Sequence, residues 1–202
     1  MIWDIYLRLF HWLLVVSVSI SLISGVLENL EVHIPAVKIV LFLLIFRFFW
    51  GIIGYPTAQF KYFIKSPKTI IQYIRKNKVS YVGHNPLGAL SVVAMLVLLL
   101  AQSISGLFKT DEVLFEAPFY NLVSSNIQTL MSEIHSSVFI IILLFIFIHI
   151  MAIIIYWFKG NNLVRAMIFG GKSKQHLNTK NMHKKAILSL VLAGFITNFI
   201  FQ

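Results

Sequence analysis

The chain has 202 residues, of which 58% are hydrophobic and only 12% charged, and its mean hydropathy of +0.85 excludes an ordinary soluble domain. Its net charge of +10 would suggest a nucleic-acid partner in a soluble protein, but in so apolar a chain it indicates membrane topology instead, and we expect no nucleic-acid binding. The absence of cysteine excludes disulfides, thiolate metal sites, iron–sulfur clusters and covalently attached haem. Any metal must therefore be held by His, Met or oxygen ligands.

Four apolar stretches are long enough, at about 20 residues, to cross a bilayer as helices. In chain order they are Leu9 to Leu27, Pro35 to Ile53, Pro86 to Phe108 and Thr129 to Trp157. A fifth stretch, Ala186 to Phe201, is shorter and either spans the membrane or lies at its surface. The sequence therefore predicts an all-α integral membrane protein, an up-down-up-down four-helix bundle with a short fifth helix at the C-terminus.

Two short amphipathic helices are expected between these spans, at the membrane surface. The first follows Ser66, an N-cap, with Pro67 at the first helical position. The second follows Asn162 and ends at Gly170. Both are explained by packing on lipid headgroups, so membrane lipid is the expected partner of these segments.

Basic residues indicate which loops face the cytoplasm. If the N-terminus is inside, residues 1–8, 54–85 and 158–185 hold 14 of the 17 Lys and Arg residues, while the opposite loops are acidic. We therefore expect a cytoplasmic N-terminus. The chain divides into a membrane domain, residues 1–172, and a basic cytoplasmic segment with the last helix, residues 173–202.

Four histidines lie within the apolar stretches or at their ends, where an unpaired polar side chain is costly. With the inferred orientation, His11 and His149 lie toward the cytoplasm, whereas His33 and His135 lie near the outer surface. His149 follows His135 by 14 residues, which is about 21 Å along a helix. The depths therefore match in two pairs, an inner pair of His11 with His149 and an outer pair of His33 with His135.

The same 14-residue step occurs on three helices. Fourteen residues of about 100° each fall some 40° short of four turns, so side chains separated by this step share a helix face. Gly25 follows His11 by this step, and Arg47 follows His33. Gly25 would leave room for a flat macrocycle at the outer site. Arg47 would bring a cation to the inner site, where an acidic group such as a haem propionate could pair with it.

Paired imidazoles at two depths fit haem iron, which takes nitrogen donors above and below the porphyrin plane. Zinc would require more ligands at one depth. A single buried histidine is explained equally well as a structural residue bonded to a neighbouring helix, but four that pair by depth favour a cofactor. His84 precedes Asn85 and Pro86, the expected N-cap and first residue of the third span, and is expected to contact headgroups or a propionate.

Several motifs occur together along the chain. They are Trp3-Asp4 with Arg8-Leu9-Phe10-His11-Trp12, Arg47-Phe48-Phe49-Trp50-Gly51, Gly83-His84-Asn85-Pro86, Ser105-Gly106-Leu107-Phe108, Glu133-Ile134-His135 and Asn162-Leu163-Val164-Arg165. With this set the chain, from Trp3 to about Lys172, resembles the bacterial cytochrome b561 and nickel–iron hydrogenase b-type cytochrome family of dihaem membrane proteins.

The resemblance implies a protein of the bacterial inner membrane with two noncovalent b-type haems, ligated by His11 with His149 and by His33 with His135. It also implies electron transfer between the quinone/quinol pool and a redox partner protein, such as a c-type cytochrome, a hydrogenase or a dehydrogenase. Two axial histidines leave no open iron position, so each haem would carry electrons rather than bind a substrate. The candidates for propionate contacts are Arg8, Arg47 and His84.

Two alternatives remain open at this stage. The chain could be a membrane anchor or subunit of a larger redox complex with a mainly structural haem, and the segment from Lys109 to Gln128 could dock a partner or pack over the outer haem. It could also be a transporter whose buried histidines relay protons. The sequence leaves the quinone site, the physiological partners and the oligomeric state, a homodimer included, undetermined.

Overall fold

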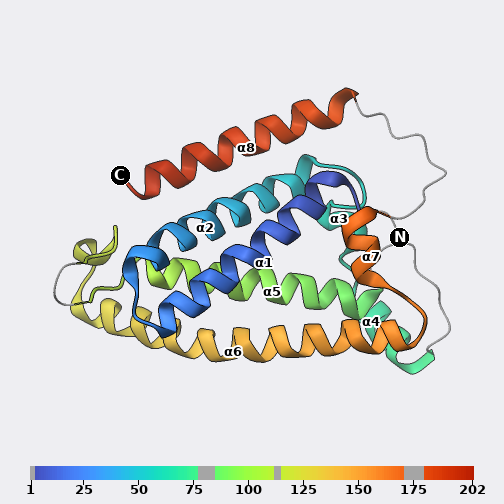
Figure 1. Cartoon of the computed structure of the whole chain (residues 1–202), viewed down its shortest axis with the longest axis horizontal. Helices are drawn as coiled ribbons and strands as arrows, with labels where there is room; N and C mark the ends of the chain where they lie inside the picture. Colours follow the sequence, from blue (N-terminus) through green and yellow to red (C-terminus); the bar gives the residue numbers. More distant parts are fainter. Residues whose placement is uncertain (1–2, 77–84, 112–114, 171–179) are drawn as a thin grey trace.

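The computed structural model describes residues 3–76, 85–111, 115–170 and 180–202, and in these ranges the regular elements are helices (Figure 1). The long helices are α1 (Ile5–Val26), α2 (Leu30–Ile53), α5 (Pro86–Gly106), α6 (Ser125–Phe158) and α8 (Lys180–Ile200). Between them lie α3 (Phe60–Phe63), α4 (Pro67–Lys76), the 3-10 helix η1 (Tyr120–Leu122) and α7 (Leu163–Phe169). All five long helices are long and apolar enough to cross a membrane, which confirms the predicted fold class.

Polar caps set the helix starts that the sequence predicted. The Asn85 side chain accepts a hydrogen bond from the Gly88 N–H, and Pro86 occupies the first position of α5, as expected. The Asn162 side chain likewise caps α7, which ends at Gly170 with φ +76°, a conformation that favours glycine. The two predicted amphipathic helices are thus present as α4 and α7.

The second span begins earlier than its apolar pattern indicated. Helix α2 starts at Leu30 because the Asn29 side chain accepts a hydrogen bond from the Val32 N–H, so the predicted start at Pro35 is wrong. His33 therefore lies inside the helix, and Pro35 is an interior residue. An interior proline removes the N–H that would bond to the carbonyl one turn earlier, and its ring crowds that carbonyl. The apolar packing of the rest of α2 offsets this cost.

The long helices form two antiparallel hairpins. Helix α1 packs against α2 and α5 packs against α6, while α2 also contacts α5 and α8 and is the most buried of the spans. Figure 1 shows α3, α4 and α7 gathered at one end of the bundle and the loop after α5 at the other. In the described part of the chain, α1 and α6 are not among the closely packed helix pairs.

An apolar cluster joins the hairpins halfway between the two histidine levels. It consists of Val40 and Leu44 of α2, Leu99 of α5 and Ile142 of α6, and Ile142 is only 1% exposed. Ile142 is seven residues from both His135 and His149, which is about 10 Å along α6 in either direction. A dry layer therefore separates the outer histidines from the inner ones.

Helix α8 packs on the outer side of α2 through small side chains. Ala186, Ser189 and Ala193 are all 0% exposed, a spacing that lets two helices approach closely in a membrane. The Tyr6 hydroxyl and His183 Nδ1 are hydrogen-bonded at 2.6 Å, which ties the start of α8 to α1. The helix begins at Lys180 rather than at the predicted Ala186, and these extra residues make it long enough to span.

Candidate functional site

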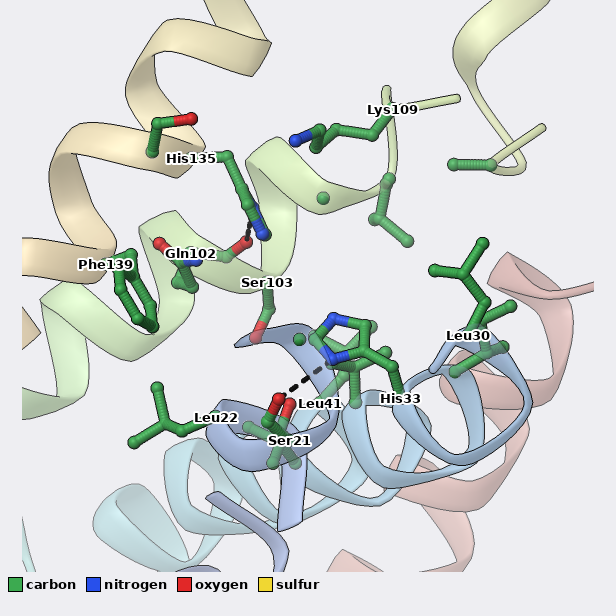
Figure 2. Close-up of a pocket in the computed structure, with 18 of the residues that line it drawn as sticks. Ser21, Leu22, Leu30, His33, Leu41, Gln102, Ser103, Lys109, His135 and Phe139 are labelled. Carbon is green, nitrogen blue, oxygen red and sulfur yellow. Dashed lines mark hydrogen bonds between the residues drawn. The ribbon is translucent and has the colours of Figure 1, made fainter. Parts of the chain in front are cut away.

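A cavity of about 550 Å³ lies at the end of the bundle that carries the loop after α5. Residues of α1, α2, α5 and α6 line it, including the two histidines of the predicted outer pair. Figure 2 shows His33 entering from α2 and His135 entering from α6. Both side chains line this one cavity, so the structure brings together the outer pair that the sequence predicted.

The ring of His33 is held by the last turns of α1. Its Nδ1 lies 2.9 Å from the Ser21 carbonyl oxygen and 3.4 Å from the Ser24 hydroxyl. A Cβ placed on Gly25 would come within 3.1 Å of the His33 Cε1, so Gly25, which also lines the cavity, makes room for the imidazole itself. The predicted role of Gly25 was space for a macrocycle, and the structure adds this second reason for a glycine.

The ring of His135 is held by α5 in the same way. Its Nδ1 lies 3.1 Å from the Gln102 carbonyl oxygen and 3.2 Å from the Ser105 hydroxyl. A Cβ on Gly106 would come within 3.1 Å of the His135 Cε1. In both rings an Nδ1–H that donates to a carbonyl leaves Nε2 as the unprotonated nitrogen.

The segment after α5 folds back over this cavity. The Ala117 N–H donates to the Lys109 carbonyl at 2.9 Å, and the Phe119 N–H donates to the Leu107 carbonyl at 2.9 Å. Phe115, Ala117 and Pro118 line the cavity together with Lys109. Of the two predicted roles for this segment, packing over the outer site is therefore the one that the contacts favour.

The residues of the predicted inner pair come from two helices, His11 from α1 and His149 from α6. The electrostatic surroundings of His11 include His149, so the two residues of the predicted inner pair lie in the same part of the bundle. His149 is exposed, whereas the Nδ1 of His11 is buried without a hydrogen-bond partner among the described residues. The inner pair is thus less enclosed than the outer pair, and it has a buried polar atom that needs a partner.

Arg47 lies buried beneath the short helix α3. It is 3% exposed, and its guanidinium carbon lies 4.6 Å from the Phe60 ring centroid and 5.7 Å from that of Phe63. It also interacts with the Asp4 carboxylate. A buried cation is therefore present inside the bundle, and its Nη1 has no hydrogen-bond partner among the described residues.

Asp4 begins α1 and is 4% exposed. Its carboxylate accepts from the Leu7 N–H at 2.9 Å and from the Trp50 Nε1–H at 3.4 Å. Burial raises the pKa of the Asp4 carboxyl above its usual value, because the charged form loses water. Asp4 and Trp50 both belong to motifs on which the family resemblance rests, and the structure places them in contact.

Arg8, another predicted propionate contact, lies where α7 meets α1. Arg8 donates from Nη1 to the Ile168 carbonyl at 2.7 Å and so fastens α7 to α1, although its buried Nε has no partner in the described chain. It lines a surface groove of about 320 Å³ with Trp12 and Met167. His84 lies outside the described residues.

The sequence did not predict the groups that hold the two outer histidine rings, nor the lysine that lines the same cavity. These are Ser21, Ser24, Gln102, Ser105, Gly106 and Lys109. One signal was available, because Ile-Ser-Gly occurs at 23–25 and again at 104–106, in each case near the outer end of the span before a histidine helix. Lys109 was a weaker signal, a single lysine in an otherwise acidic loop region.

Protein side chains alone do not complete a metal-ion site in the described ranges. No group of three or more His, Cys, Asp or Glu residues gathers there, so a zinc ion would lack its usual four ligands. Imidazoles in pairs instead suit a metal whose other positions are filled by a macrocycle. The fold and the paired histidines define a multi-pass helical membrane protein of the b-type cytochrome class.

The family comparison agrees with this class. The model of the prokaryotic cytochrome b561 family matches residues 2–170, and the chain belongs to this family. Membership implies a b-type haem and haem-based electron transfer across a membrane. No match was found among curated proteins or among solved structures.

Proposed function

We propose that the chain holds two b-type haems, one ligated by His33 and His135 and the other by His11 and His149. The observation that carries this proposal is the cavity of about 550 Å³ into which His33 and His135 both point. Haem b, when bound, supplies one-electron chemistry by changing between the ferric and ferrous states. With two such sites at different depths, the chain would conduct electrons between a quinone or quinol and a redox partner protein.

The outer site fits a haem in size and in donor chemistry. The cavity volume falls in the range of about 300–1,000 Å³ that is typical of cofactor pockets. The carbonyls of Ser21 and Gln102 accept from Nδ1 of the two histidines, so both rings can offer Nε2 to iron. Lys109 lines the same cavity and is suited to pair with a propionate.

The inner site fits through its unsatisfied polar atoms. The buried Nδ1 of His11 and the buried Nη1 of Arg47 both have no partner among the described residues, and such atoms are costly unless a ligand or water meets them. A haem ligated by His11 and His149 would bring propionates, which are suitable partners for the Arg47 guanidinium. The buried Nε of Arg8 is a second candidate for the same role.

The remaining chain would insulate this route and orient it. The apolar cluster around Ile142 excludes water between the two levels, so electrons rather than protons would cross there. The short helices α3, α4 and α7 lie at the end of the bundle where α1 begins. We infer that this end faces the cytoplasm of a bacterium, because residues 1–8, 54–85 and 158–185 of the sequence hold 14 of the 17 Lys and Arg residues. A c-type cytochrome, a hydrogenase or a dehydrogenase is the class of protein partner that we propose.

A redox titration of the purified protein, with and without a quinol, tests this function. We expect about two haems per chain, two separable reduction steps in the Soret and α bands, and reduction of at least one step by the quinol. A preparation with no haem would overturn the electron-transfer proposal. Two haems that no quinol reduces and no quinone reoxidises would overturn only its quinone part.

A further inference from the structure

Three groups at a fixed spacing hold each outer histidine. On α1 they are the Ser21 carbonyl, the Ser24 hydroxyl three residues later and Gly25 after that, all of them against the ring of His33. The hydroxyl hydrogen is used elsewhere, because Ser24 donates to the Ile20 carbonyl at 2.7 Å and lies 3.2 Å from the Ser21 carbonyl. The Ser24 oxygen can therefore present a lone pair to the His33 Nδ1–H.

Helix α5 repeats the arrangement at the same spacing. The Gln102 carbonyl, the Ser105 hydroxyl and Gly106 stand against the ring of His135. Ser105 donates to the Gln102 carbonyl at 3.1 Å, so its oxygen also faces the Nδ1–H as a second acceptor. Ser24 and Ser105 are 4% and 1% exposed, so bulk water does not reach either hydroxyl.

This geometry fixes more than the position of the rings. A neutral imidazole whose Nδ1–H is shared by a carbonyl and a hydroxyl is held in one tautomer, and the hydrogen bonds make its Nε2 a stronger donor. The inner pair differs, because Nδ1 of His11 has no such partner in the described part of the chain. The two levels of the bundle therefore offer iron ligands of unequal donor strength.

We propose that Ser24 and Ser105 are positioning residues that set the potential of the outer haem, with Gly25 and Gly106 giving the rings the space to reach them. The inference rests on the proposed ligation of a haem by His33 and His135. A stronger imidazole donor stabilises ferric iron more than ferrous iron, so these serines lower the midpoint potential of the outer haem. Electrons would then tend to move from the outer level to the inner one.

The test compares Ser24→Ala, Ser105→Ala and the double variant with a matched control. Ser17→Ala serves as that control, because Ser17 is also a buried serine of α1 whose hydroxyl bonds back along the helix, to the Leu13 carbonyl at 2.8 Å. Unlike Ser24 and Ser105, it is not hydrogen-bonded to the ring of an outer histidine. The readouts are the two midpoint potentials and the low-spin ferric EPR signals. Haem content is measured in parallel.

We expect the outer potential to rise in each single variant and further in the double variant, with the inner potential unchanged. A tenfold loss of ferric over ferrous affinity would shift a one-electron potential by about 59 mV, and the double variant is expected to approach that size. The outer EPR signal should shift as the ring planes relax. The Ser17→Ala protein should match the wild type in both readouts.

Several results would overturn the inference. The first is an outer midpoint potential and an outer EPR signal that stay unchanged in both single variants. The second is an equal shift of the outer and inner potentials, and the third is a shift of the outer potential in Ser17→Ala as large as in the test variants. Failure of the underlying ligation looks different, because His33→Ala and His135→Ala would then both retain the outer haem. If the double variant does not fold, the single variants decide, since each leaves one of the two serines in place.

Discussion

Replacement of Gly25 by alanine should weaken the outer site without weakening the helix. In the helix the change removes the entropic cost of glycine and is worth up to about 0.5–1 kcal/mol. The added Cβ would stand 3.1 Å from the His33 Cε1 and 3.2 Å from its Nδ1. Carbon atoms prefer a separation of about 3.5–4.0 Å, so the ring must move by about 0.4 Å or more and its bond to the Ser21 carbonyl must lengthen. We expect haem affinity at this site to fall by about 10–100-fold.

The assay is haem content per chain and the amplitude of each redox step in purified Gly25→Ala protein. Gly194→Ala is the matched control, because its Cβ would stand 3.9 Å from the Phe42 Cε2, an ordinary contact, in the helix α8. The control should keep both haems. If Gly25→Ala also keeps the outer haem at wild-type affinity and potential, Gly25 does not provide space for a ligand ring.

Substitutions of Asp4, Ala186 and Lys109 give three further predictions. Asp4→Asn should remove a pH dependence of stability. Because burial raises the native pKa of Asp4 above 3.8, the stability of the wild type should fall as pH rises from about 3.8 through that pKa. The asparagine amide keeps the cap but does not titrate, so unfolding titrations of the variant at several pH values should show no such fall. Asp4→Ala, which loses the cap, should be less stable than Asp4→Asn by about 0.5–2 kcal/mol. Ala186→Leu, at a 0% exposed position against α2, should cost about 1–3 kcal/mol in thermal unfolding, while Val191→Leu, at 61% exposure on the same helix, should be neutral. Lys109→Gln should lower the midpoint potential of the outer haem by the equivalent of about 0.2–1 kcal/mol and leave the potential of the inner haem unchanged. An equal fall in both potentials would show that Lys109 acts on neither site specifically.

Local patterns predicted most of the fold because they act through the neighbouring residues alone. Apolar length indicated the spans, and Asn85 and Asn162 marked helix starts through hydrogen bonds three residues away. The start of α2 was misplaced because proline usually occurs in a first turn, whereas here the cap at Asn29 acts first. That error moved the helix start by five residues but left the depth of His33 unchanged.

The histidine pairs could be predicted from depth, but the groups around them could not. The spacing along α6 predicted the separation of His135 and His149, and the distribution of charge predicts which end of the bundle faces the cytoplasm. The contacts of Ser105 and Gly106 with His135 depend on how α5 and α6 pack, which no local pattern encodes. Arg47 shows the same limit, since its spacing predicted a cation at the inner site but did not predict the aromatic rings of α3 over its guanidinium.

Haem counts in His149→Ala and His135→Ala test the central claim most directly. The account predicts one haem per chain in each variant, with the inner redox step lost in His149→Ala and the outer step lost in His135→Ala. The remaining step should keep its wild-type potential in both cases. Two haems retained in either variant, or loss of the same step in both, would contradict the proposed pairing.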